Sequence, residues 1–521
     1  MRDHGAYPDS PTEVEKLGLL EEQLVSEVGS EHESYDFDPK NYITTSVQPL
    51  QSAASILSTQ IRSTSWKRSL SSVVVFITPS FMQHNGREMI RPAKLYPTSY
   101  LDGIRGLAAL FVFFCHFFYQ AFNIAEGWGT NENNYHFLKL PFIRLFYQGA
   151  PAVCVFFVIS GYALSYRPLK FVRSRSPADF SNAISSLVFR RGIRLFLPTA
   201  TSMFIIVVLL RIGVYDWSRD FANDRRFLKN FAEPHPECLP TIYIQFHHLM
   251  MTIFQFIHIF DWDQYGGSTI LDVHLWTIPV EFRCSLFLFL VLVGTARLQT
   301  KYRYLAVGGC IFFCYCNSRW ELCLFLWGML LAEMDLVRDA HSGPVPPPFL
   351  EVVSKWKMPT KAPSFWAFII VISLYLMSMP DVNPELAPGW ATLTSMIPSW
   401  WVGERYRFWQ SISAVLFIWA VGHCTSWQSF YNSDVVQYFG KLSYALYLVH
   451  GPVLHCIGYQ IQKMTWGITG VEGHAYNLGF VMSGFFIIPI TIWIADMFWR
   501  GVDIPTVKFA KWVESKLVYR A

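Results

Sequence analysis

The stretch from Tyr100 to Gln120, YLDGIRGLAALFVFFCHFFYQ, decides how the rest of this chain is interpreted. An α-helix needs about 20 mostly apolar residues to cross the hydrocarbon core of a bilayer, and this stretch supplies them. Arg105 and His116 interrupt the apolar run. Because polar side chains inside a membrane are costly, they usually face a partner or a water-filled cavity. The stretch therefore predicts a membrane-spanning helix with a role beyond anchoring.

The composition of the whole chain agrees with a membrane location. Of 521 residues, 52% are hydrophobic, 17% are aromatic and only 15% are charged. Soluble domains carry roughly 25% charged residues, so a soluble protein of this length would lack polar surface. We expect an all-α, polytopic membrane protein that contacts the lipid bilayer and no nucleic acid. About ten apolar stretches reach or approach the spanning length, and they lie at residues 104–124, 147–166, 195–213, 275–294, 303–316, 319–335, 364–380, 409–424, 441–460 and 478–500.

Basic residues are distributed unevenly between the loops. Residues 167–194 carry seven Arg or Lys and one Asp, whereas residues 214–274 carry eight acidic and four basic side chains. Since Lys and Arg collect in cytosolic loops, we expect both chain ends in the cytosol. The apolar stretch 241–260 contains three histidines and would invert the later loops if it spanned, so we expect a re-entrant or membrane-associated segment there. The pattern leaves open whether the protein occupies an endomembrane or the plasma membrane.

The chain divides into three parts by composition. Residues 1–95 begin with an acidic stretch, whose first 50 residues hold 11 acidic and three basic side chains. Such a segment predicts a disordered cytosolic tail, and it lacks the apolar run of a cleavable signal peptide. A short interfacial piece at residues 72–82 follows it. Residues 96–500 are expected to form the membrane domain, and residues 501–521 a basic cytosolic tail.

Arg105 and His116 lie 11 positions apart, which is close to three full turns of an α-helix. They therefore share one helix face and are separated by about 16 Å along the axis. This spacing places a cation at the cytosolic end of the helix and an imidazole near the middle of the membrane. The simpler alternatives are an arginine that reaches the interface and a histidine that makes an interhelical hydrogen bond.

Four further motifs place polar side chains in apolar helices. Ser160 lies beside Gly161 in FFVISGYAL, where small residues allow helices to approach closely. Arg191 and Arg194 share one face of FRRGIRLFLP, and planar guanidinium groups suit phosphate. Glu281 in HLWTIPVEFRC needs a partner inside the membrane, and His450 lies in GKLSYALYLVHGPV. The alternatives are a basic helix flank for the arginines, a structural ion pair for Glu281 and a packing role for His450.

These motifs together resemble the acyltransferase 3 family of integral membrane O-acyltransferases, and the resemblance covers residues 96–500. The strings that carry it occur in the family's order: YLDGIRGLAALFVFFCHF, FFVISGYAL, RRGIRLFLP, LWTIPVEF and GKLSYALYLVHGPV. The acidic leading segment and the long loop after the third helix are similar to fungal members. The resemblance implies an enzyme that transfers an acyl group, usually acetyl from acetyl-CoA, to a hydroxyl of a sugar, lipid or small metabolite. For this branch we favour a small metabolite or sugar, with secondary metabolism as the setting.

The resemblance also implies roles for individual residues. Arg105 and His116 match the family's Arg-x10-His pair, Arg191 and Arg194 match its Arg-x-x-Arg pair, and Glu281 matches the acid that follows the Trp of the fourth helix, here Trp276. The chain departs from many bacterial members at residues 282–284, which are Phe-Arg-Cys, and at Ile278-Pro279, where we expect a kinked helix. These departures bear on the identity of the acceptor more than on the reaction.

The motifs define a hypothesis for the chemistry. Arg105, Arg191 and Arg194 would bind the phosphates of the donor, and the pantetheine arm would reach toward His116. An apolar site keeps an imidazole neutral and basic, so His116 is the expected general base for the acceptor hydroxyl. It could instead carry the acyl group transiently. Glu281 would either orient His116 or balance an arginine.

The motifs also bear on three other classes of function. A proton-coupled transporter or flippase also uses buried His, Arg and Glu, although no inverted repeat is visible. A membrane binding protein without activity would not need the full set of polar motifs, and a serine hydrolase would need a G-x-S-x-G turn that the chain lacks. A zinc site at His247, His248, His258 and His274 lacks metal-ligand spacing, so no metal is expected. These histidines are instead expected at an interfacial face or at the entrance for the acceptor.

Overall fold

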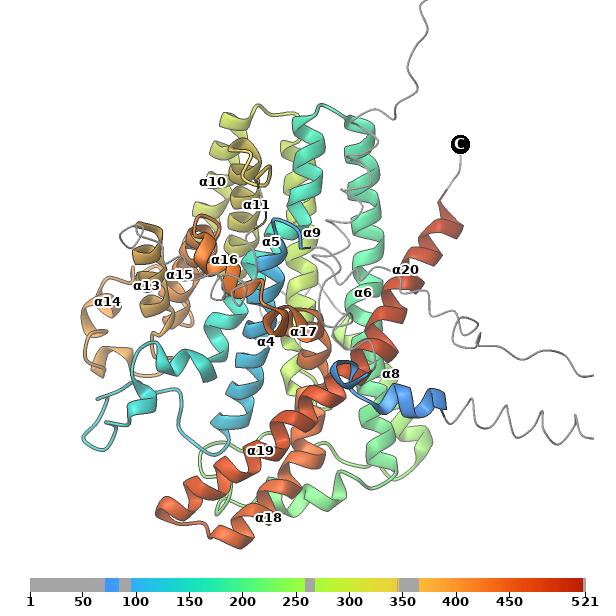
Figure 1. Cartoon of the computed structure of the whole chain (residues 1–521), viewed down its shortest axis with the longest axis vertical. Helices are drawn as coiled ribbons and strands as arrows, with labels where there is room; N and C mark the ends of the chain where they lie inside the picture. The colour runs from blue at the N-terminus through green and yellow to red at the C-terminus, as the bar shows by residue number, and fades with distance from the viewer. Residues whose placement is uncertain (1–70, 84–94, 258–267, 344, 346–364, 519–521) are drawn as a thin grey trace, which may run out of the picture.

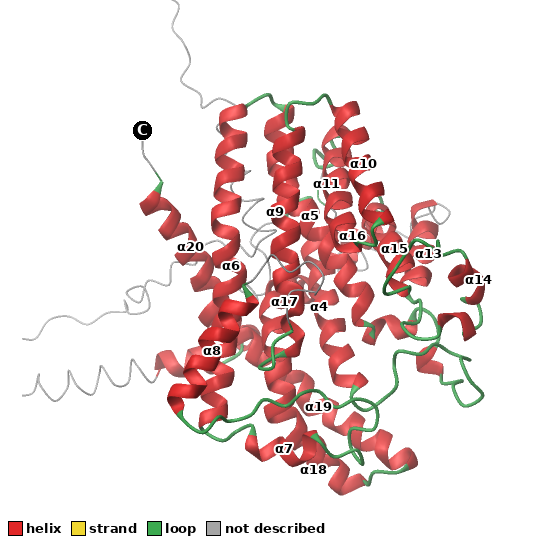
Figure 2. Cartoon of the chain, turned by 180° about the vertical axis from the view of Figure 1, so that it is seen from behind, coloured by secondary structure: helices red, strands yellow, loops and turns green. Residues whose placement is uncertain are grey.

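The computed structural model describes residues 71–83, 95–257, 268–343, 345 and 365–518. The described residues form helices and connecting loops without an extended β-sheet, and one isolated bridge joins Glu126 to Val382. Figures 1 and 2 show a bundle of long helices with shorter ones at its sides. The expected all-α class is confirmed for this part of the chain.

The central helix is α4 (Ser99–Tyr119), which contains nearly all of the apolar stretch Tyr100–Gln120. It packs against α5 (Gly149–Arg173) and α17 (Asp434–Val453). The contact with α17 is close because glycines face each other: a Cβ on Gly106 would lie 2.2 Å from the backbone nitrogen of Gly440. Small residues at such crossings allow membrane helices to associate by backbone packing.

A second close crossing joins α5 to α11 (Trp320–Val337). A Cβ on Gly161 would lie 2.2 Å from the carbonyl oxygen of Phe325, and one on Gly328 would lie 2.3 Å from the carbonyl oxygen of Val158. Backbone atoms cannot move aside as a flexible side chain can. Both glycines are therefore required for this packing.

We expect Gly161→Ala to destabilise the protein by about 1–3 kcal/mol or more, because inserting a methyl group into a packed contact forces the backbone to shift. The measurement is thermal unfolding of the detergent-solubilised protein. Gly309→Ala is the matched control, since a Cβ at Gly309 on α10 (Thr300–Cys316) meets nothing within 4 Å. Equal midpoints for the two variants would contradict the assignment.

Helices α6 (Pro177–Arg211) and α9 (Thr277–Thr295) complete the wall around the candidate site, and the 3-10 turn η5 (Val273–Trp276) leads into α9. Pro279 falls in the first turn of α9, where the missing N–H of a proline is tolerated. Pro279 therefore lies at the start of α9 and not in its interior. The change from the 3-10 turn η5 to α9 comes just before it, where a kinked helix was expected.

Five helical segments are long and apolar enough to cross a membrane: Ser99–Tyr119, Gly149–Arg173, Pro177–Arg211, Val273–Thr295 and Gly473–Leu517. A sixth appears if α15 (Tyr406–Val421) and α16 (Thr425–Tyr431), which are bent by 100° relative to each other, form one span. The other expected spans also correspond to helices, but α10 (Thr300–Cys316) and α13 (Phe365–Met377) are short. The expected count of ten spans therefore stays a prediction.

In the stretch expected at 241–260, the described part forms α8 (Ile242–Phe256), and residues 258–260 lie outside the described residues. Helix α8 packs on the side of α6 and exposes most of its apolar residues. Residues 71–83 also contact the bundle. The hydroxyl of Ser80 donates to Asp496 on α19 (Gly473–Phe498) at 2.5 Å, and the indole of Trp493 donates to the carbonyl of Ile77 at 2.6 Å. The part expected as a C-terminal tail contains α20 (Ile504–Leu517).

The remaining described elements are shorter or connect the long helices. They are η1 (Ser80–Met82), η2 (Phe137–Lys139), η3 (Ile143–Tyr147), η4 (Asp216–Ser218), α7 (Arg219–Ala222), η6 (Pro384–Leu386), α14 (Ala391–Ser395), the π-helical turns η7 (Leu454–Gly458) and η8 (Trp499–Asp503), and α18 (Tyr459–Thr469).

Candidate active site

The polar residues of α4 belong to two clusters at different depths of the bundle. Arg105 lines a pocket between α4, α5, α6, α9 and α17, and His116 belongs to a group of histidines further along the same helix. Val112 lies between them in the sequence and also lines the pocket. The face of α4 that was expected to carry both residues thus connects the two clusters.

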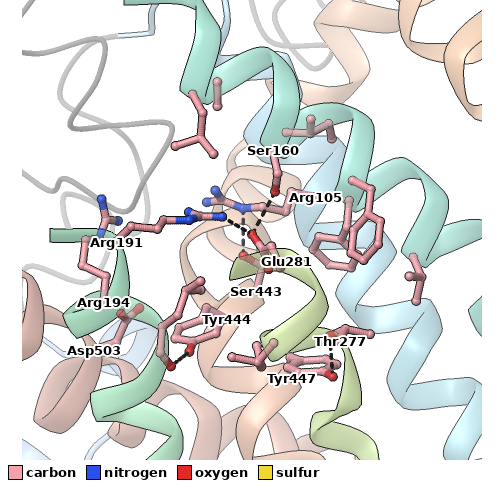
Figure 3. Close-up of a pocket in the computed structure, with 18 of the residues that line it drawn as sticks. Arg105, Ser160, Arg191, Arg194, Thr277, Glu281, Ser443, Tyr444, Tyr447 and Asp503 are labelled. Atoms are coloured by element: carbon pink, nitrogen blue, oxygen red, sulfur yellow. Dashed lines mark hydrogen bonds and ion pairs between the residues drawn. The ribbon is translucent and has the colours of Figure 1, made fainter. Parts of the chain in front are cut away.

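The pocket brings together side chains that are distant in sequence (Figure 3). Arg105, Ser160, Arg191, Arg194 and Glu281 all line it, and the cavity has a volume of about 160 Å³. Five of the residues singled out from sequence therefore meet at one place. A polar-lined cavity inside an apolar bundle is a common setting for ligand binding.

Glu281 is the partner of an arginine in this pocket. Its Oε1 lies 2.6 Å from Nη2 of Arg191 and accepts a hydrogen bond from the hydroxyl of Ser160 at 3.0 Å. Nε of Arg191 donates to the hydroxyl of Ser285 at 3.1 Å. Of the two roles expected for Glu281, the structure places it where it balances an arginine. The carboxylate near His116 comes from elsewhere.

The other arginines of the pocket also lie near carboxylates. Nη2 of Arg105 is 3.0 Å from Asp102, and its Nε donates to the hydroxyl of Ser443 at 3.0 Å. Arg194 and Asp503 both line the cavity (Figure 3). The pocket is therefore cationic, but much of its charge is already offset.

The floor of the pocket touches the histidine cluster. Thr277 and Tyr447 line the cavity, and the hydroxyl of Thr277 donates to that of Tyr447 at 2.6 Å. The Tyr447 hydroxyl in turn donates to the carbonyl oxygen of His274. The Tyr447 hydroxyl therefore links the pocket to the histidine cluster.

Three histidines form the second cluster. The ring centroids of His116 and His274 are 4.1 Å apart, those of His274 and His450 are 4.7 Å apart, and those of His116 and His450 are 5.2 Å apart. His116 and His450 were both singled out from sequence, and the structure brings them together. From the sequence, His274 was one of four histidines expected at an interfacial face or at the acceptor entrance, with a zinc site as the alternative. Trp276, which ends η5, is partly buried.

Glu233 holds this cluster together from the loop that follows α6. Its carboxylate accepts hydrogen bonds from His274 at 2.8 Å, His455 at 2.7 Å and Gln120 at 2.9 Å, and from the hydroxyl of Tyr119. Burial alone would raise the pKa of Glu233, but the charge of His274 and the hydrogen bonds from neighbouring histidines hold it well below its usual range. Glu233 is therefore an ionised carboxylate in a buried site.

His116 faces the same carboxylate. Its Nδ1 lies 3.6 Å from Oε1 of Glu233, a distance that a small shift would close to a hydrogen bond. A carboxylate beside one ring nitrogen fixes the imidazole tautomer and stabilises the protonated form. The other ring nitrogen of His116 is then the one available to remove a proton.

His274 is held on both sides. Its Nδ1 lies 2.6 Å from Asp272 and its Nε2 lies 2.8 Å from Glu233. Because ionised carboxylates only accept, both ring nitrogens must donate, and His274 carries a positive charge. Gly451 packs directly against the His274 ring. A Cβ at this position would lie 2.4 Å from Nδ1 of His274, so the position requires a glycine.

The ligand atoms of His116, His274 and His450 all lie within 4.8 Å of one another, a spacing that would suit a metal ion. However, both ring nitrogens of His274 are occupied by carboxylates. The expected zinc ligands do not gather: His247 and His248 belong to no group with metal-ligand spacing among the described residues, and His258 lies outside them. The absence of a metal requirement stays a prediction.

Sequence reasoning missed Glu233, Asp272 and His455. Glu233 and Asp272 lie in a loop region rich in acidic residues, so neither stood out. His455 lies in the π-helical turn η7, five residues after His450. Nδ1 of His455 is 3.0 Å from Nδ1 of His235. A chain of hydrogen bonds therefore runs from Glu233 through His455 to His235, which is partly exposed.

Comparison with known proteins identifies the family of the chain. Residues 98–500 match the acyltransferase 3 family, described as an acyltransferase domain. The chain is 30% identical over 471 residues to O-acetyltransferase PaAT-1 of Phomopsis amygdali, an alignment that covers 85% of this chain and 88% of that protein. It is 25% identical over 452 residues to acyltransferase clz18 of Cochliobolus lunatus, covering 79% and 94% of the two chains. No solved structure matches. The chain therefore belongs to the acyltransferase 3 family and is a membrane O-acyltransferase.

Proposed function

We propose that this enzyme transfers an acetyl group from acetyl-CoA to a hydroxyl of a small metabolite or sugar. The observation that carries the proposal is the continuity of the arginine-lined pocket with the histidine cluster, through the floor formed by Thr277 and Tyr447. The name of the O-acetyltransferase relative supports acetyl as the group transferred.

In the proposed mechanism the two clusters have different roles. Arg105, Arg191 and Arg194 attract the anionic donor, and the pocket between the helices accepts the thin pantetheine arm. Glu281 keeps Arg191 in place through their 2.6 Å contact. Donor binding then brings the thioester toward the floor of the pocket, next to His274 and His116.

His116 is the general base in this proposal. It takes the proton of the acceptor hydroxyl as the oxygen attacks the thioester carbonyl carbon, and Glu233 stabilises the imidazolium that forms. The carbon–sulfur bond then breaks, and His116 returns the proton to the thiolate of CoA. His274 supplies a fixed positive charge beside the developing oxyanion, a form of electrostatic stabilisation that costs no reorganisation. If His116 instead carries the acyl group, the same carboxylate orients it for attack.

We also propose that the arginine pocket opens toward the cytosol, with ten spans and both chain ends on that side. The distribution of Lys and Arg between loops supports this orientation. The acceptor then approaches the histidines from the opposite side, where the loop bearing Glu233 lies.

The test uses the full-length protein in purified membranes with labelled acetyl-CoA and a panel of hydroxylated metabolites and sugars. The expected result is label in an ester product that depends on the protein. A proton-coupled transporter is the alternative. Movement of a substrate into sealed vesicles without CoA, combined with no transfer of label to any acceptor, would overturn the proposal in favour of that class.

A further inference from the structure

A second cavity lies where α5 turns into α6 and α9 turns into α10, at one end of the bundle (Figures 1 and 2). Its volume is about 930 Å³, which falls in the range of ligand pockets. It does not share a lining residue with the active-site pocket among the described residues. Nothing in the proposed mechanism uses it.

Three of the four arginines that line the cavity have no acidic partner among the residues that the structure describes. Arg173 and Arg175 come from the α5–α6 turn and Arg297 from the α9–α10 turn, and all three are exposed. Their side chains form no ion pair with any residue in the described ranges. The carboxylate of Asp179 accepts a hydrogen bond from Ser176, which lines the cavity.

A fourth arginine in the cavity has a structural role. Nε of Arg303 donates to both carboxylate oxygens of Glu333 at 2.8 and 2.9 Å, and its Nη1 donates to the carbonyl of Leu298 at 3.0 Å. These contacts fix the α9–α10 turn against α11. The unpaired Arg297 is thereby held at a defined position on a rigid turn.

The backbone around the cavity adds to its preference for anions. Arg175 adopts a positive φ of 56°, an unusual conformation for a residue other than glycine, and this turns the chain between the two helices. Helix α10 begins at Thr300, which lines the cavity, and the free N–H groups of a helix start favour negative charge. Phe171 and Phe180 provide apolar walls.

The active-site pocket contrasts with this cavity. Its volume is about 160 Å³, and Arg191 and Arg105 are each within 3.0 Å of a carboxylate. Such a site suits the neutral arm of a donor better than a group with several phosphates. Along α6, Pro177 beside the second cavity and Arg191 in the active-site pocket are 14 residues apart, or about 21 Å.

We propose that this cavity is a binding site for phosphate esters, in which Arg173, Arg175 and Arg297 contact the phosphate groups. Two sources share this chemistry: the phosphorylated nucleotide half of acyl-CoA and the headgroup of an anionic phospholipid. The nucleotide source rests on the proposed function, whereas the phosphate site itself does not.

The experiment measures equilibrium binding to the full-length protein in nanodiscs, so it needs no turnover and can be interpreted even if the proposed reaction is wrong. One arm titrates 3′-phosphoadenosine 5′-diphosphate into neutral-lipid nanodiscs. The other arm measures retention of phosphatidylserine by native mass spectrometry. Arg173→Gln/Arg297→Gln is compared with Arg225→Gln/Arg405→Gln, which removes the same charge from exposed arginines elsewhere.

We expect the first double variant to bind one of the two ligands at least tenfold more weakly than the control variant. Weaker binding of the nucleotide identifies the donor as the source, and weaker binding of the phospholipid identifies the headgroup. Arg173→Lys/Arg297→Lys keeps the charge and should retain most of the affinity, which excludes a folding defect. Equal binding of both ligands by the two Gln variants, or binding of neither ligand by the unmodified protein, would overturn the proposal.

Discussion

Replacing His116 with alanine is expected to lower acyl transfer by about 10²–10⁴-fold, the usual contribution of a general base. The acceptor hydroxyl would then have to lose its proton without a base in the buried site. Glu233 cannot replace His116, because four hydrogen-bond donors already hold its carboxylate. The measurement is the initial rate of label transfer from acetyl-CoA to an acceptor in membranes that contain equal amounts of each protein.

His247→Ala is the matched control for this variant, since His247 is exposed on α8 and makes no contact with the cluster. It should keep the rate of the unmodified enzyme. A wild-type rate for His116→Ala would remove His116 from the mechanism. Incubation with labelled acetyl-CoA alone separates the two roles of His116: label retained on the protein, and lost in His116→Ala, identifies an acyl carrier.

The second large effect is expected for Glu233→Gln. This change keeps the shape of the side chain but removes the charge between His116, His274 and His455. Removing one partner of a buried charged pair typically costs 3–5 kcal/mol, so the variant should unfold at a lower temperature. Because the low pKa of Glu233 keeps the carboxylate ionised, the loss should be seen at any pH at which the enzyme works.

A kinetic measurement distinguishes positioning of His116 from a general loss of structure. For folded Glu233→Gln protein, kcat should fall at least 100-fold while KM for the acyl donor stays within about twofold, because other residues build the donor pocket. Glu233→Asp should restore part of the rate. Glu237→Gln, at an exposed carboxylate in the same loop, is the control and should leave both parameters unchanged. A rise in KM with unchanged kcat would contradict the assigned role of Glu233.

The long apolar stretches of the sequence were enough to predict the helical fold, and the resemblance to the acyltransferase 3 family singled out much of the pocket. Arg105, Arg191 and Glu281 each lie in a long helix, and helices have a regular geometry from which a shared face can be derived. Five expected spans appear as long helices. Whether the shorter helices α10 and α13 cross the membrane could not be predicted from the sequence. Length and apolarity alone do not distinguish a short membrane span from a buried helix.

The histidine cluster was harder to predict because it depends on tertiary contacts. Glu233 is more than 100 residues from His116 in the chain, in a loop without a repeating pattern. His274 becomes doubly hydrogen-bonded only once Asp272 and Glu233 close around it. The partner of Glu281 was ambiguous for the same reason, since helix geometry gives the direction of a side chain but not the neighbouring helix that it meets.

The two clusters differ in how they are built, and this has a consequence for divergence within the family. The donor pocket consists of residues on helices that pack through glycine contacts, so substitutions there disturb the whole bundle. The base is supported by Glu233 and Asp272 from loops, which accept insertions and exchanges more readily. Selection can therefore alter the loops and acquire new acceptors while the same donor continues to be used. A single helical scaffold can in this way give rise to enzymes that use different acceptors.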